Sequence, residues 1–237
     1  MTNPAKLSAN AAASKRAAVL SRIERACQAA GRDPAGVTLL AVGKRHPAAA
    51  LATLYAQGQR HFGENYVQEA RGKQAELPDD VVWHMIGPLQ SNKSREVAEH
   101  FDWLHTLDSA KLARRLSQQR PPERGPLNVC IQVNLDDEAS KSGVDAAGAH
   151  ALAALVRELP GLRLRGLMAI PAPSQEPALQ YERCAAVAAL QAALAADCDT
   201  LSLGMSADLE AAIRAGSTLV RVGTDLFGPR PDSAGAA

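Results

Sequence analysis

Eight short strand-like segments, each separated from the next by a segment of helical periodicity, are the feature that most constrains the fold of this chain. They lie at residues 37–42, 60–62, 81–86, 101–105, 127–135, 162–170, 200–203 and 218–222. The first is an almost uninterrupted apolar run, which is typical of a strand that is buried on both faces. Strands that alternate with helices in this way predict an α/β fold with a parallel sheet.

The number of strand–helix units favours a closed barrel. Eight units, preceded by an additional N-terminal helix at residues 11–30, predict a single (β/α)8 TIM-type barrel. The alternative is an open doubly wound sheet, but no GxGxxG motif follows the first strand, as dinucleotide binding would require. We expect the barrel at residues 15–230, a flexible N-terminus at 1–14 and a flexible tail at 231–237.

Composition excludes several classes of function. The formal net charge of +1 argues against nucleic-acid binding, which depends on excess positive charge. No apolar stretch is long enough to span a membrane, and the N-terminal residues lack the apolar run of a signal peptide. No metal site is expected, because none of the four cysteines has a CxxC partner or a nearby histidine. Cysteines of this kind indicate reduced thiols and a cytoplasmic protein.

Small residues follow the last two strands, where barrels commonly bind phosphate. Gly204-Met205-Ser206 follows the seventh strand, with Ser206 expected as the N-cap of the next helix, and Gly223-Thr224 follows the eighth. Backbone N–H groups at such positions can approach an anion closely. Either segment alone could be only a turn, but together they favour a phosphate group.

Lys44 directly follows the first strand and therefore points toward the barrel mouth. Desolvation there would lower its pKa and suit imine formation, although solvated loop lysines are also common. A Schiff-base lysine and a phosphate site at one mouth fit a single ligand, pyridoxal 5′-phosphate (PLP), which carries an aldehyde and a phosphate.

Each of the other polar residues near the strand ends has two possible roles. Arg221 on the eighth strand would donate to the pyridine nitrogen of PLP and keep it unprotonated, or would lie outward on a solvated face. His84 would face the cofactor or make a hydrogen bond in the core, and Asn65 would bond the ring hydroxyl or cap a helix. Lys141 would meet a ligand or partner, or would be a solvated loop lysine.

These segments resemble the pyridoxal phosphate homeostasis protein family. The matching segments are 39–44 (LLAVGK), 62–69 (FGENYVQE), 84–93 (HMIGPLQSNK), 140–143 (SKSG), 165–168 (RGLM), 201–206 (LSLGMS) and 221–224 (RVGT). The chain departs from the family's usual pattern at Gly43, where serine is common, at Arg45-His46, and at Asp225, where a small apolar residue is usual. The departures at Gly43 and Asp225 bear on loop rigidity and local charge.

The resemblance implies a fold-type III barrel similar to the N-terminal domain of alanine racemase, with Lys44 as the cofactor lysine. It also implies that Ser206, Gly223 and Thr224 bind phosphate, that Arg221 faces the pyridine nitrogen, and that Asn65 and Met205 lie in the cofactor shell. The expected cofactor-binding residues, none with a catalytic role, are Lys44, Asn65, His84, Met205, Ser206, Arg221, Gly223 and Thr224.

Three functions are compatible with these residues. The first is a PLP carrier or regulator of the vitamin B6 pool without robust catalysis, acting as a monomer or weak dimer with PLP-requiring apo-enzymes as candidate partners. The second is a racemase, which needs an acid/base on each face of the substrate. We expect no second domain to supply one, and Tyr55, Tyr66 and Tyr181 all lie in predicted helices. The third is an aldolase-like lysine barrel without PLP.

Overall fold

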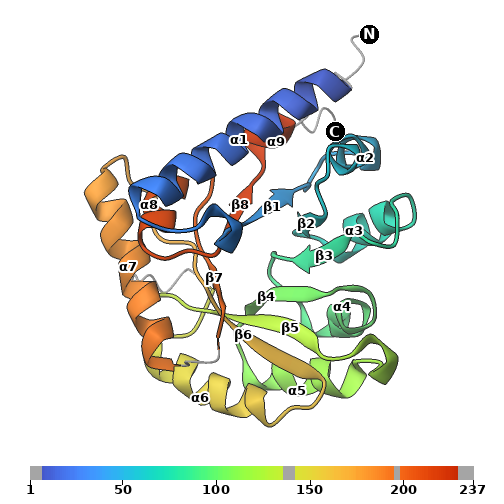
Figure 1. Cartoon of the computed structure of the whole chain (residues 1–237). Coiled ribbons are helices and arrows are strands. Elements are labelled where there is room, and N and C mark those ends of the chain that lie inside the picture. Colours follow the sequence, from blue (N-terminus) through green and yellow to red (C-terminus); the bar gives the residue numbers. More distant parts are fainter. Residues whose placement is uncertain (1–6, 136–141, 195–197, 229–237) are drawn as a thin grey trace, which may run out of the picture.

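Eight parallel strands close into a barrel in the computed structural model, which describes residues 7–135, 142–194 and 198–228 (Figure 1). Each strand pairs with the next, and β1 closes the ring against β8. The strands are β1 (Thr38–Val42), β2 (His61–Glu64), β3 (Val82–Met85), β4 (Trp103–Leu107), β5 (Leu127–Gln132), β6 (Leu162–Met168), β7 (Thr200–Ser202) and β8 (Leu219–Val222). The predicted (β/α)8 barrel is confirmed.

Helices cover the outside of the barrel. They are α1 (Ala9–Ala29), α2 (Ala48–Ala56), α3 (Val67–Gln74), α4 (Ser94–His100), α5 (Ala110–Gln119), α6 (Ala146–Arg157), α7 (Pro177–Leu194), α8 (Leu209–Arg214) and α9 (Thr224–Phe227). The sequence predicted each of these except α9. The helical segment between β3 and β4 begins with a 3₁₀ turn at Ser91–Lys93 ahead of α4. The strand predicted at 127–135 is shorter than expected, because β5 ends at Gln132.

The N-terminal helix α1 packs across α8, α9 and α2, outside the β8–β1 side of the barrel (Figure 1). The hydroxyl of Ser8 caps its first turn by accepting from the backbone N–H of Ala11 at 3.2 Å. Its buried residues repeat at helical spacing, and they are Ala12, Val19, Ile23, Ala26 and Cys27. Because α1 begins at Ala9, part of the expected flexible N-terminus is helical; the expected tail lies outside the described residues.

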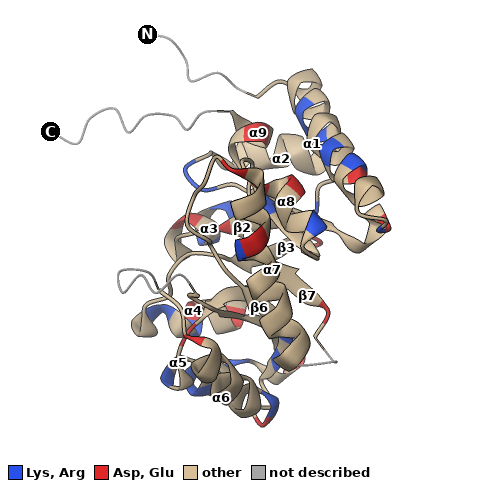
Figure 2. Ribbon diagram, turned by 90° about the vertical axis from the view of Figure 1, so that its left-hand side faces the viewer, with Lys and Arg blue, Asp and Glu red and all other residues tan. Residues whose placement is uncertain are grey.

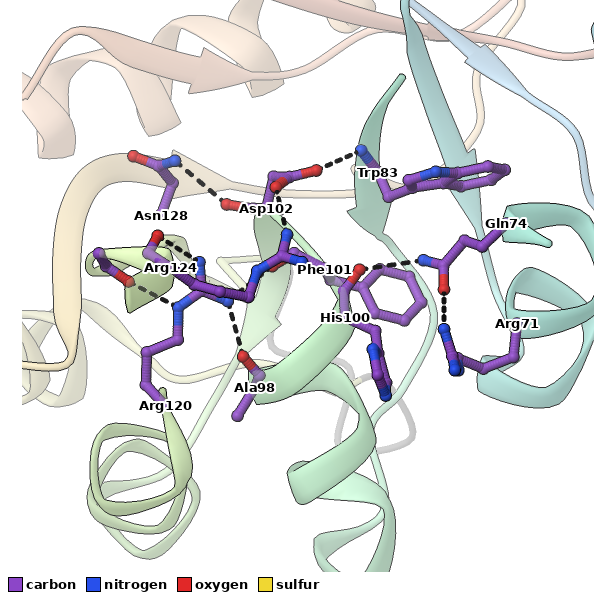
Figure 3. A network of polar contacts seen from close by, with 11 residues as sticks. Arg71, Gln74, Trp83, Ala98, His100, Phe101, Asp102, Arg120, Arg124 and Asn128 are labelled. Carbon is purple, nitrogen blue, oxygen red and sulfur yellow. Dashed lines mark hydrogen bonds and ion pairs between the residues drawn. The ribbon is translucent and has the colours of Figure 1, made fainter. Parts of the chain in front are cut away.

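Polar contacts connect the strands at the amino-terminal end of the barrel (Figure 3). The Asp102 carboxylate accepts from the Trp83 backbone N–H at 2.8 Å and from Arg124 at 2.9 Å, and the Asp102 carbonyl accepts from Asn128 at 3.1 Å. The buried Arg120 guanidinium donates to the backbone carbonyls of Ala98, Phe101 and Gly125 at 2.7 Å each. This end is therefore organised for stability, and the opposite end, the mouth, carries the candidate site.

Candidate functional site

Lys44 lies at the mouth, in the turn that follows β1, and its side chain is half-buried. The end of β1 lies beside the loop after β8, because a Cβ built on Gly223 would be 3.4 Å from the carbonyl oxygen of Val42. The same turn packs on α9 through His46 and Phe227, whose rings stack with centroids 4.8 Å apart. Lys44 is thus next to one of the two loops predicted to hold phosphate.

We call residues 204–208, after β7, and residues 223–225, after β8, the mouth loops. They begin side by side, since the backbone N–H of Arg221 donates to the carbonyl of Gly204 at 2.9 Å. Gly204 has a φ of +89° and a Cβ there would be 2.7 Å from Ala212, so glycine is required. Among the described residues, the backbone N–H groups of Ser206 and Thr224 donate to no protein acceptor. Both loops therefore offer donors to an anion.

Ser206 is not the N-cap of the following helix, and that prediction was wrong. The helix α8 begins at Leu209 with Asp208 at its N-cap position. The Asp208 carboxylate instead accepts from the backbone N–H of Met205 at 2.6 Å, which closes a turn ahead of the helix. Ser206 is consequently a turn residue, and Met205 beside it is 39% exposed.

Arg22 on α1 joins the two mouth loops from outside the barrel. Its guanidinium donates to the carbonyl of Ser206 at 2.9 Å and to the carboxylate of Asp225 at 2.7 Å. It also binds both carboxylate oxygens of Glu210 at 2.8 and 2.9 Å, and this pairing lowers the pKa of Glu210. In Figure 2, basic positions on α1 lie close to acidic positions on α8 and α9. The unusual Asp225 therefore has a local partner.

Arg221 points into the barrel and is only 5% exposed, which excludes the alternative of a solvated outward arginine. It donates to the carbonyl and hydroxyl oxygens of Ser202 at 2.7 and 2.8 Å and to the carbonyl of Ala169 at 3.0 Å. Burial lowers the pKa of Arg221 to about 10, so the side chain remains a cation and a pure donor at neutral pH. A guanidinium has more N–H groups than these contacts use, which leaves donors for a ligand at the mouth.

A chain of histidines continues from Arg221 through the barrel interior. The Ser202 hydroxyl is 2.9 Å from Nδ1 of His105, Nε2 of His105 is 2.8 Å from Nδ1 of His84, and Nε2 of His84 is 3.0 Å from Nδ1 of His61. His61 lines a pocket of about 260 Å3 at the other end of the barrel. Both ring nitrogens of His84 are engaged in this core chain, which agrees with the predicted alternative of a hydrogen-bonded core histidine.

The buried imidazoles should make the protein sensitive to mild acid. Burial lowers the pKa of His105 to about 3 and that of His84 well below its usual 6.5. Below pH 6.5 the unfolded chain gains protons at these rings while the folded chain does not, so the free energy of unfolding decreases. We expect a loss of about 2 kcal/mol between about pH 6.5 and 5.5, measured by urea denaturation. A constant free energy over this range would contradict neutral imidazoles.

Asn65 lies at the mouth directly after β2 and lines a pocket of about 270 Å3. Residues from the ends of β4, β5 and β6 complete this pocket, among them Thr106, Gln132 and Ala169. The N-cap position of α3 is Tyr66, so Asn65 is not a helix cap. Lys141 lies outside the described residues.

The sequence interpretation missed Arg22 and treated the histidines one at a time. Side chains alternate between the interior and the exterior along a barrel strand. Because His61, His84 and His105 lie on the neighbouring strands β2, β3 and β4, the sequence could have predicted that their side chains meet inside the barrel. Arg22 had no comparable signal, because its partners are 184 to 203 residues away in the sequence.

The chain matches the family described as alanine racemase, N-terminal domain, over residues 15–231. It is 58% identical over 222 residues to the pyridoxal phosphate homeostasis protein of Pseudomonas aeruginosa, and the match covers 93% of this chain and 96% of the relative. The chain belongs to the pyridoxal phosphate homeostasis protein family. The resemblance inferred from the motifs is therefore confirmed over almost the whole chain.

Solved structures agree with this family assignment. The PipY protein of Synechococcus elongatus PCC7942, a COG0325 family member solved with PLP bound, is 42% identical with a TM-score of 0.76, covering 87% of this chain and 100% of PipY. Alanine racemase from Corynebacterium glutamicum is 17% identical with a TM-score of 0.67, covering 92% of this chain and 62% of the enzyme, and shares the fold alone. Within the described part of this family member, no helix has the length and apolar character needed to cross a membrane.

Proposed function

We propose that this protein binds PLP as a Schiff base on Lys44 and serves intracellular PLP homeostasis as a carrier or regulator without robust catalysis. The observation that carries the proposal is the meeting of three features at one mouth. Lys44 lies beside the loop after β8, that loop starts next to the loop after β7, and Arg221 near the end of β8 donates to Ser202 at the end of β7. The name of the P. aeruginosa relative and the PLP bound to PipY support the same reading.

The residues at the mouth fit the chemical groups of PLP. Lys44 offers an amine for the aldehyde. The backbone N–H groups of Ser206 and Thr224, which have no acceptor within the described part of the chain, and the small Gly223 between β8 and α9 suit the phosphate. Asn65 follows β2 at the same end of the barrel, and Met205 lies in the loop after β7. When bound, PLP supplies an aldehyde for imine formation and a ring that can accept electrons.

Arg221 limits how far that ring can act as an electron acceptor. The guanidinium remains protonated and donates, so it would hold the pyridine nitrogen of bound PLP as a hydrogen-bond acceptor without a proton. A carboxylate at this position would do the opposite. The buried partners Ser202 and Ala169 fix the guanidinium in this role. This chemistry suits storage of the cofactor better than strong activation of it.

The tyrosines also favour a carrier over a racemase. The hydroxyl of Tyr55 donates to Asp80, and the ring of Tyr181 lies 4.4 Å from the guanidinium carbon of Arg214. Tyr66, at the N-cap of α3 and 55% exposed, is the one tyrosine of the chain that directly follows a mouth residue. A racemase would need it, or another group, as the second acid/base.

The experiment that tests the function is transfer of PLP from the loaded protein to a PLP-requiring apo-enzyme. We expect reactivation from the loaded protein to occur at a rate that differs from free PLP at the same total concentration, with no amino-acid racemisation above that of free PLP. Racemisation well above that level, lost in both Lys44→Ala and Tyr66→Phe, would instead establish the enzyme alternative. Purified protein that gains no visible absorbance with added PLP would favour a lysine barrel without the cofactor.

Arg22 should contribute to phosphate affinity through the mouth loops. Removing it in Arg22→Gln leaves the Ser206 carbonyl and Asp225 without their donor and loosens both loops. Because these contacts are partly exposed, we expect about 1 kcal/mol of lost binding, or about 5-fold weaker PLP affinity. Arg25→Gln is the matched control, since Arg25 is on the same helix and donates to Ser21 alone among the described contacts. Equal PLP affinities for the two variants, measured by equilibrium dialysis, would show that the contacts of Arg22 with the mouth loops do not contribute to PLP binding.

A further inference from the structure

A buried cluster of three charged side chains lies behind the turn that carries Lys44. Glu64 ends β2, and Glu69 and Lys73 lie one turn apart on α3. The Lys73 ammonium is 2.7 Å from a carboxylate oxygen of Glu64, 2.7 Å from one of Glu69 and 2.8 Å from the carbonyl oxygen of Gly43. These three contacts use all three N–H groups of the ammonium. Glu64 is fully buried and Lys73 is 5% exposed.

The cluster holds the backbone on both sides of Lys44. On one side, the Gly43 carbonyl accepts from Lys73, and the Gly43 N–H donates to the Gly63 carbonyl at 3.0 Å. On the other side, the Arg45 N–H donates to the Glu69 carboxylate. Arg45 has a φ of +64°, a left-handed conformation that is uncommon for a residue with a Cβ. The contact with Glu69 therefore helps to keep the turn in a conformation that it would rarely adopt alone.

Glu64 fills the space that a side chain at position 43 would need. A Cβ built on Gly43 would be 2.6 Å from Oε1 of Glu64 and 3.0 Å from the side chain of Leu51. The departure at Gly43 thus makes room for a buried carboxylate beside the lysine turn. Oε2 of Glu64 has no hydrogen-bond partner among the described residues. An unpartnered buried carboxylate oxygen is costly for folding, which suggests a role for it in the site.

The charges that act on Glu64 come from the two elements packed against it. The pKa of Glu64 is raised to about 7, because the effect of burial outweighs the attraction of Lys73. The repulsion of Glu69 also raises this pKa, and the attraction of Lys44 lowers it. Because Lys73 is shared between two carboxylates, the cluster alone contains one negative charge more than positive when both are ionised. Lys44 supplies a further positive charge that acts on Glu64.

We propose that Glu64, Lys73 and Glu69 are positioning residues for Lys44, fixing its turn and setting the pH at which its amine becomes neutral and able to react. The inference rests on the proposed function, in which Lys44 takes up and releases PLP. The negative charge of Glu64 and Glu69 favours the Lys44 ammonium, and the Lys73 cation opposes it. Removing a carboxylate and removing the cation must therefore move the pKa of Lys44 in opposite directions.

The test measures the pKa of Lys44 in the protein without PLP, so it does not depend on cofactor binding. Lysines are reductively methylated with 13C-formaldehyde, the Lys44 signal is assigned by its loss in Lys44→Arg, and its chemical shift is followed with pH. We expect Glu64→Gln to lower the pKa of Lys44 by about one unit and Lys73→Met to raise it. Glu76→Gln, an exposed carboxylate in the segment after α3, is the matched control and should leave it unchanged.

Shifts of opposite sign in the pKa of Lys44 would distinguish a positioning role from damage to the fold, because general damage should not raise this pKa in one variant and lower it in the other. Shifts of the same sign, or no shift in either variant, would overturn the proposal. If Glu64→Gln does not fold, Glu69→Gln replaces it, because the Glu69 side chain is 25% exposed, and a lowered pKa is again expected. If Lys73→Met does not fold, Lys73→Gln replaces it, because it also removes the cation, and a raised pKa is again expected. If the pKa of Lys44 shifts in opposite directions but the protein does not bind PLP, the proposed function is wrong and the positioning role is still supported.

Discussion

Lys44→Ala should abolish the visible absorbance of the PLP-loaded protein, because it removes the amine that we propose forms the imine with the aldehyde. The mouth loops remain intact in this variant, so PLP should still bind through its phosphate, with its affinity reduced by the loss of the covalent bond. Lys44→Arg keeps the positive charge beside Glu64 but cannot form a stable imine, and it should lose the absorbance to the same extent.

The control for the Lys44 variants is Lys111→Ala, an exposed lysine of α5. Absorbance titration with PLP gives the imine, and equilibrium dialysis gives the total PLP bound. Visible absorbance that persists in Lys44→Ala at the wild-type level would place the attachment on another lysine. Equal loss in Lys111→Ala would indicate that the signal reports general lysine modification.

Arg221→Leu should have the second largest effect, on stability and on binding together. The substitution removes the donors of three buried acceptor contacts, two on Ser202 and one on Ala169, and we expect the free energy of unfolding to fall by about 2–4 kcal/mol. It also removes the charged donor that we propose for the pyridine nitrogen, which should weaken PLP binding by about 10- to 100-fold. Urea denaturation and dialysis measure the two effects separately.

A second variant separates the two roles of Arg221. Arg221→Gln can still donate to Ser202, so more stability should remain, while the cation is lost and the absorbance maximum of bound PLP should shift. Unchanged PLP affinity and unchanged absorbance in both variants would show that Arg221 does not face the ring. Stability loss without a binding effect would leave it as a structural residue of the barrel core.

The fold was predictable because each strand and helix leaves a local pattern. The eight strands lie within two residues of their predicted starts. The short helix α9 was missed because four residues are too few for helical periodicity. The N-cap at Ser206 was misassigned because a serine in a turn and a serine at a helix start have the same local sequence signal.

The mouth residues were predictable because strand ends in a barrel converge, but the charges behind them were not. A lysine on a helix is usually exposed, so nothing in the sequence marks Lys73 as buried. The spacing of Glu69 and Lys73 is compatible with an ordinary surface ion pair. Only the packing of α3 against the Lys44 turn shows that this pair lies inside the protein and contacts Gly43.

The most direct test of the proposed attachment to Lys44 is to identify the lysine that carries PLP on the protein. The PLP-loaded wild-type protein is reduced with borohydride, which converts an imine into a stable amine, and is then digested and mapped by mass spectrometry. We expect one dominant phosphopyridoxyl adduct, on the peptide that contains Lys44. A dominant adduct on any other lysine, or no adduct on a protein that retains PLP, would contradict the account.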